Sequence, residues 1–220
     1  MPEQYAVDIV LCIDVTGSMS PVIDTVKKGA LSFHQRFVDA MTAKEKSVGR
    51  LRLRVVAYRD FAADRNNPIE LSDFWTVPEE TDQFKRFVKG LRADGGGDEP
   101  ESGLEALALA INSEWEREAE RRRHVIVLFT DASAHPLGVG AGAAKYPRGL
   151  PTDLGELSAL WASGAVDRGA KRLLLFAPDV EPWKTIAGTW SNTLHSASTA
   201  GTGLRDVELD EIIGVIAGSV

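Results

Sequence analysis

The sequence has little of several features that would assign it to a class at once. Cysteine occurs once in 220 residues, so no disulfide can form within the chain. The four histidines show none of the spacings of a zinc site. Lysine and arginine number 25 against 32 aspartates and glutamates, and the net charge of −7 argues against a large nucleic-acid interface. The one basic run, Arg121–Arg123, is expected to end a helix, whose dipole its cations would complement.

The chain also lacks a long apolar run and an N-terminal leader pattern. No stretch of about 18 apolar residues is present, and Met1–Tyr5 does not resemble a secretory signal. Cys12 lies in an apolar run and is expected to be a buried small hydrophobe. These features predict a cytoplasmic protein without a membrane segment. The apolar fraction of 44% and the charged fraction of 26% are those of a globular chain, and we expect residues 1–220 to form one domain.

Two kinds of apolar pattern alternate along the chain. Short runs predict strands at 6–13, 51–58, 74–77, 124–129, 172–177 and 193–197. Apolar residues at helical spacing predict helices at 22–41, 81–91, 104–115, 153–166, 181–190 and 207–220. This alternation is typical of a three-layer, doubly wound, Rossmann-like α/β fold. We expect a mostly parallel sheet with helices on both faces and one short antiparallel edge strand.

Side chains with oxygen atoms follow the first predicted strand. Asp14, Thr16 and Ser18 alternate in an extended turn before the first helix, so the three can converge on one point. Ligands of open α/β sheets bind beyond the carboxyl ends of the strands. One carboxylate and two hydroxyls suit a hard divalent cation such as Mg²⁺. The alternative is an ordinary turn, because aspartate and serine are common in turns.

Two further loops carry acidic residues that could reach the same point. Residues 95–101 are Gly-Gly-Gly-Asp-Glu-Pro-Glu. Asp98 in this loop is either a metal ligand or the N-cap of the next helix, with Glu101 completing a capping box. The predicted strand 124–129 ends at Thr130-Asp131, where Asp131 either caps the following loop or faces the cation.

The three loops together resemble those of von Willebrand factor A domains. Residues 14–19, Asp-Val-Thr-Gly-Ser-Met, are similar to the family's Asp-x-Ser-x-Ser signature. The glycine-rich loop is similar to that of hemicentin-like and alpha-kinase-associated A domains, with Asp98 where many members have a threonine. The resemblance implies a bacterial-type protein-interaction module with a metal-ion-dependent adhesion site. Its implied ligands for Mg²⁺, Mn²⁺ or Ca²⁺ are Asp14, Thr16, Ser18, Asp98 and Asp131.

The charge of this site bears on the kind of partner it accepts. Asp14, Asp98 and Asp131 would surround a divalent ion with three carboxylates, one more than in members with the threonine. The added charge should tighten metal binding and make the ion a poorer acceptor for a partner's carboxylate.

The partner itself is expected to be another protein of unknown identity, with no nucleic acid and no membrane involved. Its contact surface should be the rim of the site, including Tyr58, Arg59 and Asp60 after the second strand and the loop 132–152. The alternative is that Arg59 and Asp60 pair with neighbouring charges.

A metal-assisted phosphohydrolase that uses Asp14 is the alternative function. The strand–Asp–turn–helix pattern resembles the nucleophile loop of haloacid-dehalogenase phosphatases, but the second acidic residue of that loop is Thr16 here. This change leaves no proton donor for a phosphoaspartate mechanism. The chain has no Gly-Lys-Ser/Thr loop, and the glycines of 138–142 open no predicted helix. The absence of an acid/base pair in the three loops favours the binding module.

Overall fold

A sheet of seven strands forms the middle layer of the protein. The structure is a computed structural model that describes residues 4–29, 32–64, 67–96, 99–198, 200 and 209–220. The strands are β1 (Gln4–Asp14), β2 (Ser47–Tyr58), β3 (Ile69–Leu71), β4 (Trp75–Val77), β5 (Arg122–Phe129), β6 (Lys171–Pro178) and β7 (Thr193–Ser198). Their order is β3-β2-β1-β5-β6-β7, and β4 also pairs with β2. The five long strands run parallel, whereas β3 and β4 are antiparallel to β2.

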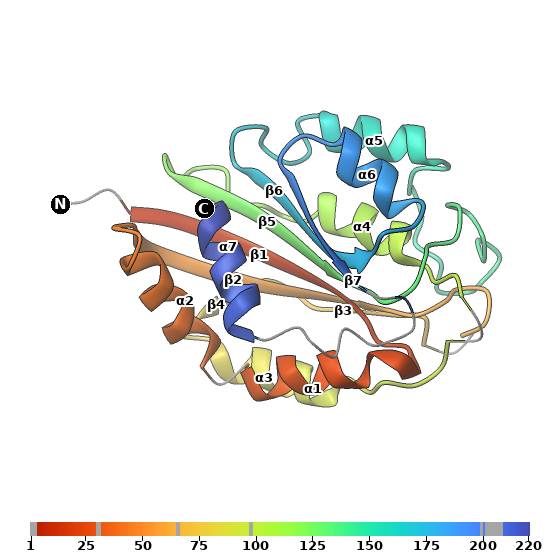
Figure 1. The fold of residues 1–220 in the computed structure, drawn as a ribbon, viewed down its shortest axis with the longest axis horizontal. Coiled ribbons are helices and arrows are strands. Elements are labelled where there is room, and N and C mark those ends of the chain that lie inside the picture. The colour runs from red at the N-terminus through yellow and green to blue at the C-terminus, as the bar shows by residue number, and fades with distance from the viewer. Residues whose placement is uncertain (1–3, 30–31, 65–66, 97–98, 199, 201–208) are drawn as a thin grey trace.

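Helices cover both faces of this sheet. They are α1 (Ser20–Gly29), α2 (Phe33–Thr42), α3 (Thr81–Gly90), α4 (Gly103–Ile111), α5 (Leu154–Ala162), α6 (Trp183–Thr189) and α7 (Leu209–Ser219), with a 3-10 turn η1 at Gly17–Met19. Helices α4, α5 and α6 lie on one face, and α1, α2, α3 and α7 lie on the other (Figure 1). The predicted doubly wound α/β fold is therefore confirmed.

Burial on both faces explains the nearly continuous apolar sequence of the central strand. Side chains at odd positions of β1, such as Val7 and Ile13, enter the core beneath α1, α2, α3 and α7. Val10 and Cys12 enter the core beneath α4, α5 and α6. The predicted burial of Cys12 is confirmed, and this burial raises the pKa of its thiol to about 12. The thiol is therefore a packing group without thiolate reactivity at neutral pH.

Some element boundaries differ from the predictions. The pattern predicted as one helix over 22–41 is divided between α1 and α2. The helix predicted to reach Trp115 ends at Ile111, and the Trp115 indole folds back to donate to the Ile111 carbonyl at 3.0 Å. The apolar spacing persists there although the backbone is no longer helical. At the edge, β4 accounts for the predicted antiparallel strand, and the three-residue β3 is an addition too short to show periodicity.

The basic run does not end a helix, so that prediction was wrong. Arg122 and Arg123 begin β5, where the buried apolar run after them is extended. The Nε atom of Arg123 donates to the Val220 carbonyl at 2.9 Å, and that of Arg172 donates to the Ser219 carbonyl at 2.9 Å. These guanidinium groups complement the carboxyl terminus of α7, a helix far away in the sequence.

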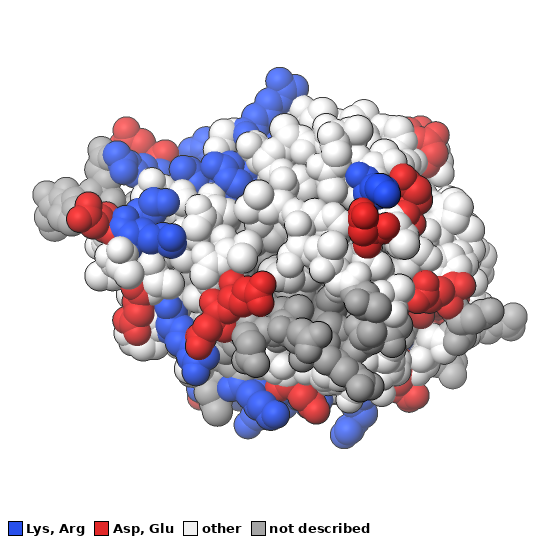
Figure 2. Space-filling view, in the orientation of Figure 1, with Lys and Arg blue, Asp and Glu red and all other residues white. Residues whose placement is uncertain are grey.

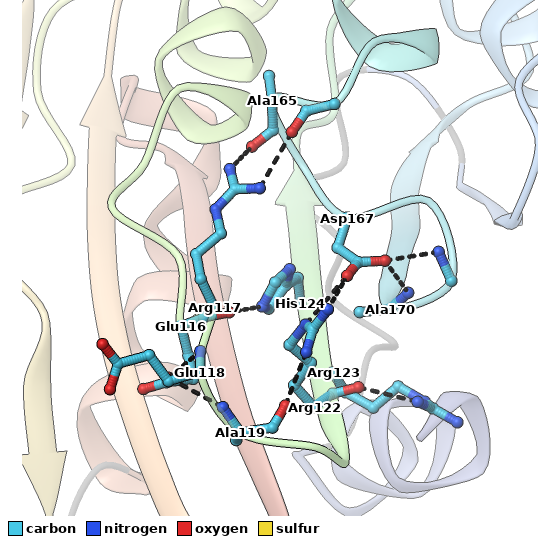
Figure 3. Close-up of polar contacts among 12 residues, drawn as sticks. Glu116, Arg117, Glu118, Ala119, Arg122, Arg123, His124, Ala165, Asp167 and Ala170 are labelled. Carbon is cyan, nitrogen blue, oxygen red and sulfur yellow. Dashed lines mark hydrogen bonds and ion pairs between the residues drawn. The ribbon is translucent and has the colours of Figure 1, made fainter.

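Paired charges hold the amino end of the sheet, where the parallel strands begin. The Asp8 carboxylate is 1% exposed and accepts from Arg52 Nε at 2.8 Å and Arg52 Nη2 at 2.6 Å. Beside it, Arg122 Nε contacts Asp167 Oδ2 at 3.0 Å, and a His124 ring nitrogen lies 2.7 Å from the Glu116 carbonyl (Figure 3). Burial lowers the pKa of His124 to about 4, so its ring is neutral at pH 7.

Charges of both signs are distributed over the surface. On the face shown in Figure 2, basic side chains lie mostly toward the left, over the amino end of the sheet, and acidic ones are spread over the whole face. None of the helices in the described part of the chain combines the length and apolarity needed to cross a membrane.

Candidate functional site

The first and third predicted loops meet at the carboxyl end of the sheet. Parallel pairing places Ile13 beside Phe129, so the residues that follow β1 and β5 emerge next to each other. Ser18 Oγ donates to Asp131 Oδ1 at 2.9 Å, and Thr130 Oγ1 donates to Asp14 Oδ2 at 2.8 Å. Each of these contacts joins residues more than a hundred positions apart in the sequence.

Asp14 lies at the bottom of this arrangement, with 0% exposure. Its Oδ1 atom accepts from the backbone nitrogen of Thr16 at 2.9 Å and from Thr16 Oγ1 at 2.6 Å. Burial raises the pKa of Asp14 to about 6, although the hydrogen bonds from Thr16 and Thr130 oppose the shift and the charge of Asp131 adds to it. The carboxylate therefore accepts three hydrogen bonds, all of them from neutral groups of Thr16 and Thr130.

The site opens to solvent above Asp14. Ser18 is exposed in η1, whereas Thr16 and Asp131 are buried. The glycine-rich loop passes over the first loop, because Asp94 N donates to the Val15 carbonyl at 3.1 Å and Gly17 N donates to the Gly95 carbonyl at 3.3 Å. All three predicted loops thus reach one place. Asp98 lies outside the described residues, so its expected metal role stays a prediction.

Glu101 does not complete a capping box, so that alternative was wrong. Helix α4 begins at Gly103 with Ser102 as its N-cap residue, which leaves Glu101 before the helix. Its backbone pairs instead with the loop after β5: Glu101 N donates to the Ser133 carbonyl at 3.1 Å, and His135 N donates to the Glu101 carbonyl at 2.8 Å. This extended pairing is incompatible with a first helical turn at Glu101.

The side chain of Glu101 faces the site and was not among its predicted members. A Cβ atom placed on Gly96 would lie 2.8 Å from both Glu101 Oε1 and the Thr16 side chain, so the two side chains face each other across Gly96. Burial, together with the charges of Asp14, Asp60, Asp64 and Asp131, raises the pKa of Glu101 to about 9. Its place at the end of the glycine-rich loop was visible in the sequence, but the direction of its side chain was not.

The exposure expected for the rim residues was wrong. Tyr58, Arg59 and Asp60 follow β2 at the same edge as Asp14, as predicted, but they are 0%, 6% and 4% exposed. Side chains this deeply buried offer almost no contact area, and whether they affect partner binding stays a prediction.

Arg59 has an internal role that explains its burial. Its guanidinium donates to three backbone carbonyls, those of Asp94 at 2.9 Å, Asn67 at 2.8 Å and Arg92 at 2.8 Å. It also contacts Glu70 at 3.5 Å. The alternative expectation, that Arg59 pairs with a neighbouring charge, is consistent with its contact to Glu70. Arg59 therefore fixes the start of the glycine-rich loop against β2.

The loop after β5 is fastened to the helices on one face of the sheet. The Trp183 indole, which is fully buried, donates to the Ala132 carbonyl at 2.9 Å. Farther along, the buried carboxylate of Glu105 accepts from the Tyr146 hydroxyl at 3.0 Å and from Gly138 N at 3.3 Å. These contacts position the residues that follow Asp131.

Hollows lie on two sides of the site. One, of about 610 Å³, is lined by charged and polar groups that include Arg59, Asp64, Asn67, Glu70, Arg92 and Asp94. The other, of about 320 Å³, is lined mainly by apolar side chains that include Leu104, Pro136, Leu137, Leu154 and Pro182. Backbone and side chains of a binding partner could enter either hollow.

The chemistry of the donors fits a hard cation. The side chains of Asp14, Thr16, Ser18 and Asp131 offer carboxylate and hydroxyl oxygens, as Mg²⁺ prefers, whereas Zn²⁺ prefers nitrogen and sulfur. Within the described residues, no three acidic, histidine or cysteine side chains are grouped closely enough to hold a metal alone. A site here therefore needs the hydroxyls of Thr16 and Ser18 in addition to carboxylates.

Two curated proteins resemble part of the chain. An alpha-protein kinase of Dictyostelium discoideum, vwkA, is 28% identical over 150 residues, which is 67% of this chain and 22% of the kinase. A putative ariadne-like RING finger protein of Acanthamoeba polyphaga mimivirus is 25% identical over 135 residues, which is 61% of this chain and 12% of that protein. The chain thus spans less than a quarter of the length of either relative.

Solved structures share the fold at low sequence identity. The pilus adhesin SpaC of Lactobacillus rhamnosus GG has a TM-score of 0.57 at 9% identity, over 99% of this chain and 31% of SpaC. Proximal thread matrix protein 1 of the mussel byssus has a TM-score of 0.51 at 12% identity, over 98% of this chain and 49% of its own. The sequence profile of the von Willebrand factor A domain matches residues 8–137. The chain therefore belongs to the von Willebrand factor A domain family.

Proposed function

We propose that this chain is a cation-dependent interaction module that docks a protein partner at the carboxyl end of its sheet. The observation that carries the proposal is the hydrogen bond between Ser18 and Asp131, which unites two oxygen-bearing loops directly above the buried Asp14. Hydroxyl and carboxylate oxygens at one solvent-facing point form a donor set for Mg²⁺, Mn²⁺ or Ca²⁺.

Hydrogen bonding prepares this donor set for a cation. Thr16 gives its hydroxyl proton to Asp14 and Ser18 gives its proton to Asp131, so the lone pairs of both hydroxyl oxygens stay available to an ion. Asp14 and Asp131 supply negative charge beside those oxygens, and Asp98 would add a further carboxylate. The bound ion would supply positive charge and open coordination positions at the surface.

The hollows beside the site are the proposed contact surface for the partner. The side chains of Tyr58 and Arg59 are almost fully buried, so the hollows offer a partner more accessible surface than these side chains do. Membership of the family supports a role in protein interaction, and the pilus adhesin and RING finger protein that resemble this chain are, by name, of kinds that contact other molecules. The identity of the partner, the bacterial type and the cytoplasmic compartment stay predictions.

The geometry does not favour the phosphohydrolase alternative. A nucleophilic Asp14 would need a free carboxylate oxygen directed at a phosphorus atom. Instead the side chain is fully buried, and both of its oxygens accept hydrogen bonds from Thr16 and Thr130.

Calorimetric titration with MgCl₂ and MnCl₂ tests the proposed function. Wild type should bind one ion, and Asp14→Ala should lose most of its affinity because the hydroxyl of Thr16 is no longer oriented. Asp24→Ala is the matched control, since Asp24 is an exposed acid on α1 near the first loop. Equal affinity of wild type and Asp14→Ala for both metals would contradict the assignment.

Partner binding is tested separately with the metal-loaded protein. Purified protein is immobilised, and candidate partners are captured in the presence of Mg²⁺ or of a chelator. Capture that depends on Mg²⁺ and is lost in Asp14→Ala but not in Asp24→Ala is the expected result. Capture that is unaffected by the chelator would place the interface elsewhere.

A further inference from the structure

The smaller hollow beside the site is lined mainly by apolar side chains and lies where the starts of three helices meet. Leu104 comes from α4, Leu154 from α5 and Pro182 from the turn before α6. Pro136 and Leu137 come from the loop after β5. The volume of about 320 Å³ is near the lower limit of known ligand pockets, which is about 300 Å³. A space of this size and polarity suits an apolar side chain of a partner better than a large cofactor.

Contacts behind the walls of the hollow hold them in place. Glu101 N donates to the Ser133 carbonyl at 3.1 Å, and His135 N donates to the Glu101 carbonyl at 2.8 Å, which fastens the loop after β5 to the segment before α4. A Cβ atom placed on Gly103 would lie 2.8 Å from the Trp183 ring, so α4 and α6 approach each other closely. Because the walls are already ordered, a partner that enters the hollow loses little free energy in fixing them.

Two exposed acids lie at the mouth of the hollow. Asp153 is the N-cap of α5 and Glu181 lies just before α6, and both line the hollow. Asp153 Oδ1 accepts from Glu156 N at 2.8 Å, and Glu181 Oε2 accepts from Thr185 Oγ1 at 2.6 Å. Each acid therefore uses one oxygen at the start of its helix and has a second oxygen to offer to a ligand.

The charge of these two acids is not compensated by the chain around them. Lys184 of α6 pairs with Asp179, with Nζ 3.7 Å from Oδ2. The ring of His135, which also lines the hollow, faces Asp60, with Nε2 3.6 Å from Oδ1. Among the described residues, no cationic side chain forms an ion pair with either acid at the mouth. An acidic mouth therefore favours a cationic group on the molecule that enters.

We propose that the apolar hollow binds a protein segment in which an aliphatic side chain of leucine size is flanked on both sides by lysine or arginine. The aliphatic group packs on Leu104 and Leu137, and the flanking cations meet Asp153 and Glu181. Val180, directly before Glu181, is 38% exposed and adds apolar surface next to that acid. The inference rests on the proposed function, because it specifies the chemistry of the partner for one of the two hollows.

The same features select against other segments. Acidic flanks would bring like charges to the mouth and would be repelled there. A polar side chain inside the hollow would lose its hydrogen bonds to water without gaining others from the apolar walls. The aliphatic group and the basic flanks are therefore both needed for binding.

Three capped tripeptides test these two requirements. Acetyl-Arg-Leu-Arg-amide has both features, acetyl-Arg-Ser-Arg-amide lacks the aliphatic group, and acetyl-Glu-Leu-Glu-amide reverses the flanking charge. Each is titrated in MgCl₂ buffer into protein with isotope-labelled leucine methyl groups, and the methyl signals are followed by NMR. Only the first should produce saturable shifts of Leu104, Leu137 and Leu154. Leu53, in the core on the other face of the sheet, should not respond.

Variants of the mouth and the wall locate the bound peptide. Asparagine caps helices as well as aspartate does, so Asp153→Asn removes the charge and keeps the cap. Glu181→Gln likewise keeps an oxygen for the start of α6. Each should weaken the binding of acetyl-Arg-Leu-Arg-amide about threefold, as expected for an exposed ion pair. Ala134→Leu should abolish binding because the larger side chain fills the hollow. Glu120→Gln, at an exposed acid of the amino end, should match wild type.

Unchanged affinity in both charge variants, or equal binding of acetyl-Glu-Leu-Glu-amide, would overturn the inference, as would unchanged binding by folded Ala134→Leu. The charge variants carry the test if Ala134→Leu does not fold. Signals at the hollow that depend on protein concentration alone would assign it to a second copy of the chain, which also overturns the inference.

The outcomes separate this inference from the proposed function. If calorimetry shows bound Mg²⁺ and acetyl-Arg-Leu-Arg-amide causes no shifts at the hollow, the inference fails and the proposed function stands. If the peptide binds at the hollow of a protein that binds neither Mg²⁺ nor Mn²⁺, the chemistry of the hollow is supported and the cation-dependent function fails.

Discussion

A buried carboxylate has a charged hydrogen-bond partner at the amino end of the sheet and only neutral partners at the carboxyl end. Asp8 and Asp14 occupy even positions of β1 and are 1% and 0% exposed. Asp8 receives two hydrogen bonds from the guanidinium of Arg52 on the neighbouring strand. Asp14 receives hydrogen bonds only from neutral groups of Thr16 and Thr130. A charge that the chain neutralises itself holds the fold together, whereas a charge left without a counterion is available to a ligand.

The difference extends beyond the two aspartates. At the amino end, further acids meet arginines, as Asp167 meets Arg122 and Glu116 meets Arg50. At the carboxyl end, Glu101 adds to the acids, and its burial raises its pKa to about 9. Burying uncompensated charge destabilises a folded domain, so the acids at the carboxyl end contribute less to stability than the paired acids at the amino end.

The largest expected effect comes from filling the space beside Glu101. Gly96 has a φ of +71°, and a Cβ there would lie 2.8 Å from Glu101 Oε1 and from the Thr16 side chain. Gly96→Ala should therefore strain the backbone, push the two side chains apart and weaken Mg²⁺ binding at least about tenfold. The control is Gly142→Ala, where a Cβ meets nothing within 4 Å. Calorimetry that shows unchanged affinity in Gly96→Ala would contradict this geometry.

Breaking the paired charge at the amino end should affect stability but not binding. Asp8→Asn leaves Arg52 without its buried carboxylate and should lower the free energy of unfolding by about 3 kcal/mol. Its Mg²⁺ affinity should equal that of wild type, because the substitution is at the far end of β1. Chemical denaturation and calorimetry on the same sample measure both quantities. A loss of Mg²⁺ affinity would show that the two ends are coupled. Asp210→Asn, in an exposed pair with Arg36, should change little.

Removing the unpaired charge should have the opposite effect on stability. The pKa of Asp14 is raised from 3.8 to about 6, so the folded state holds this proton more tightly than the unfolded state. The metal-free protein should therefore lose stability as pH rises from about 4 to about 6, and the loss persists at pH 7. Asp14→Asn should be more stable than wild type at pH 7 by about 2 kcal/mol and should bind no Mg²⁺. Lower stability of this variant in metal-free buffer would contradict the argument.

A smaller effect of pH is expected from His124 at the amino end. Its pKa is lowered from 6.5 to about 4, so the unfolded state binds the proton more tightly. Stability should fall by about 1 kcal/mol as pH drops from about 6.5 to about 5.5. Denaturation in saturating Mg²⁺ measures this effect while the acids of the site stay ionised. His124→Asn should make the free energy of unfolding less dependent on pH in this range. An equally steep dependence in this variant would show that other groups cause the effect.

The sequence could predict features that depend on the order of strands and helices. It could not predict side-chain positions that depend on contacts between residues far apart in the chain. Strand ends in a parallel sheet meet at one edge, so the proximity of Ser18 and Asp131 could be predicted from the order of the strands. The burial of Arg59 depends on carbonyls of residues 67, 92 and 94, and no local pattern encodes that contact. The direction of Glu101 depends likewise on backbone pairing with the loop after β5. Topology was predictable, whereas side-chain direction in loops was not.

The hydrogen bond from Trp183 to the Ala132 carbonyl gives the molecule an internal optical probe. Ala132 follows Asp131 directly, so a displacement of this loop changes the polarity next to the indole. Trp161 of α5 stacks on Trp190, and Trp115 stacks on His124 at the amino end, away from this loop. The emission of Trp183 therefore reports on the loop of Asp131, and replacing Trp183 with phenylalanine separates this emission from that of the other four tryptophans.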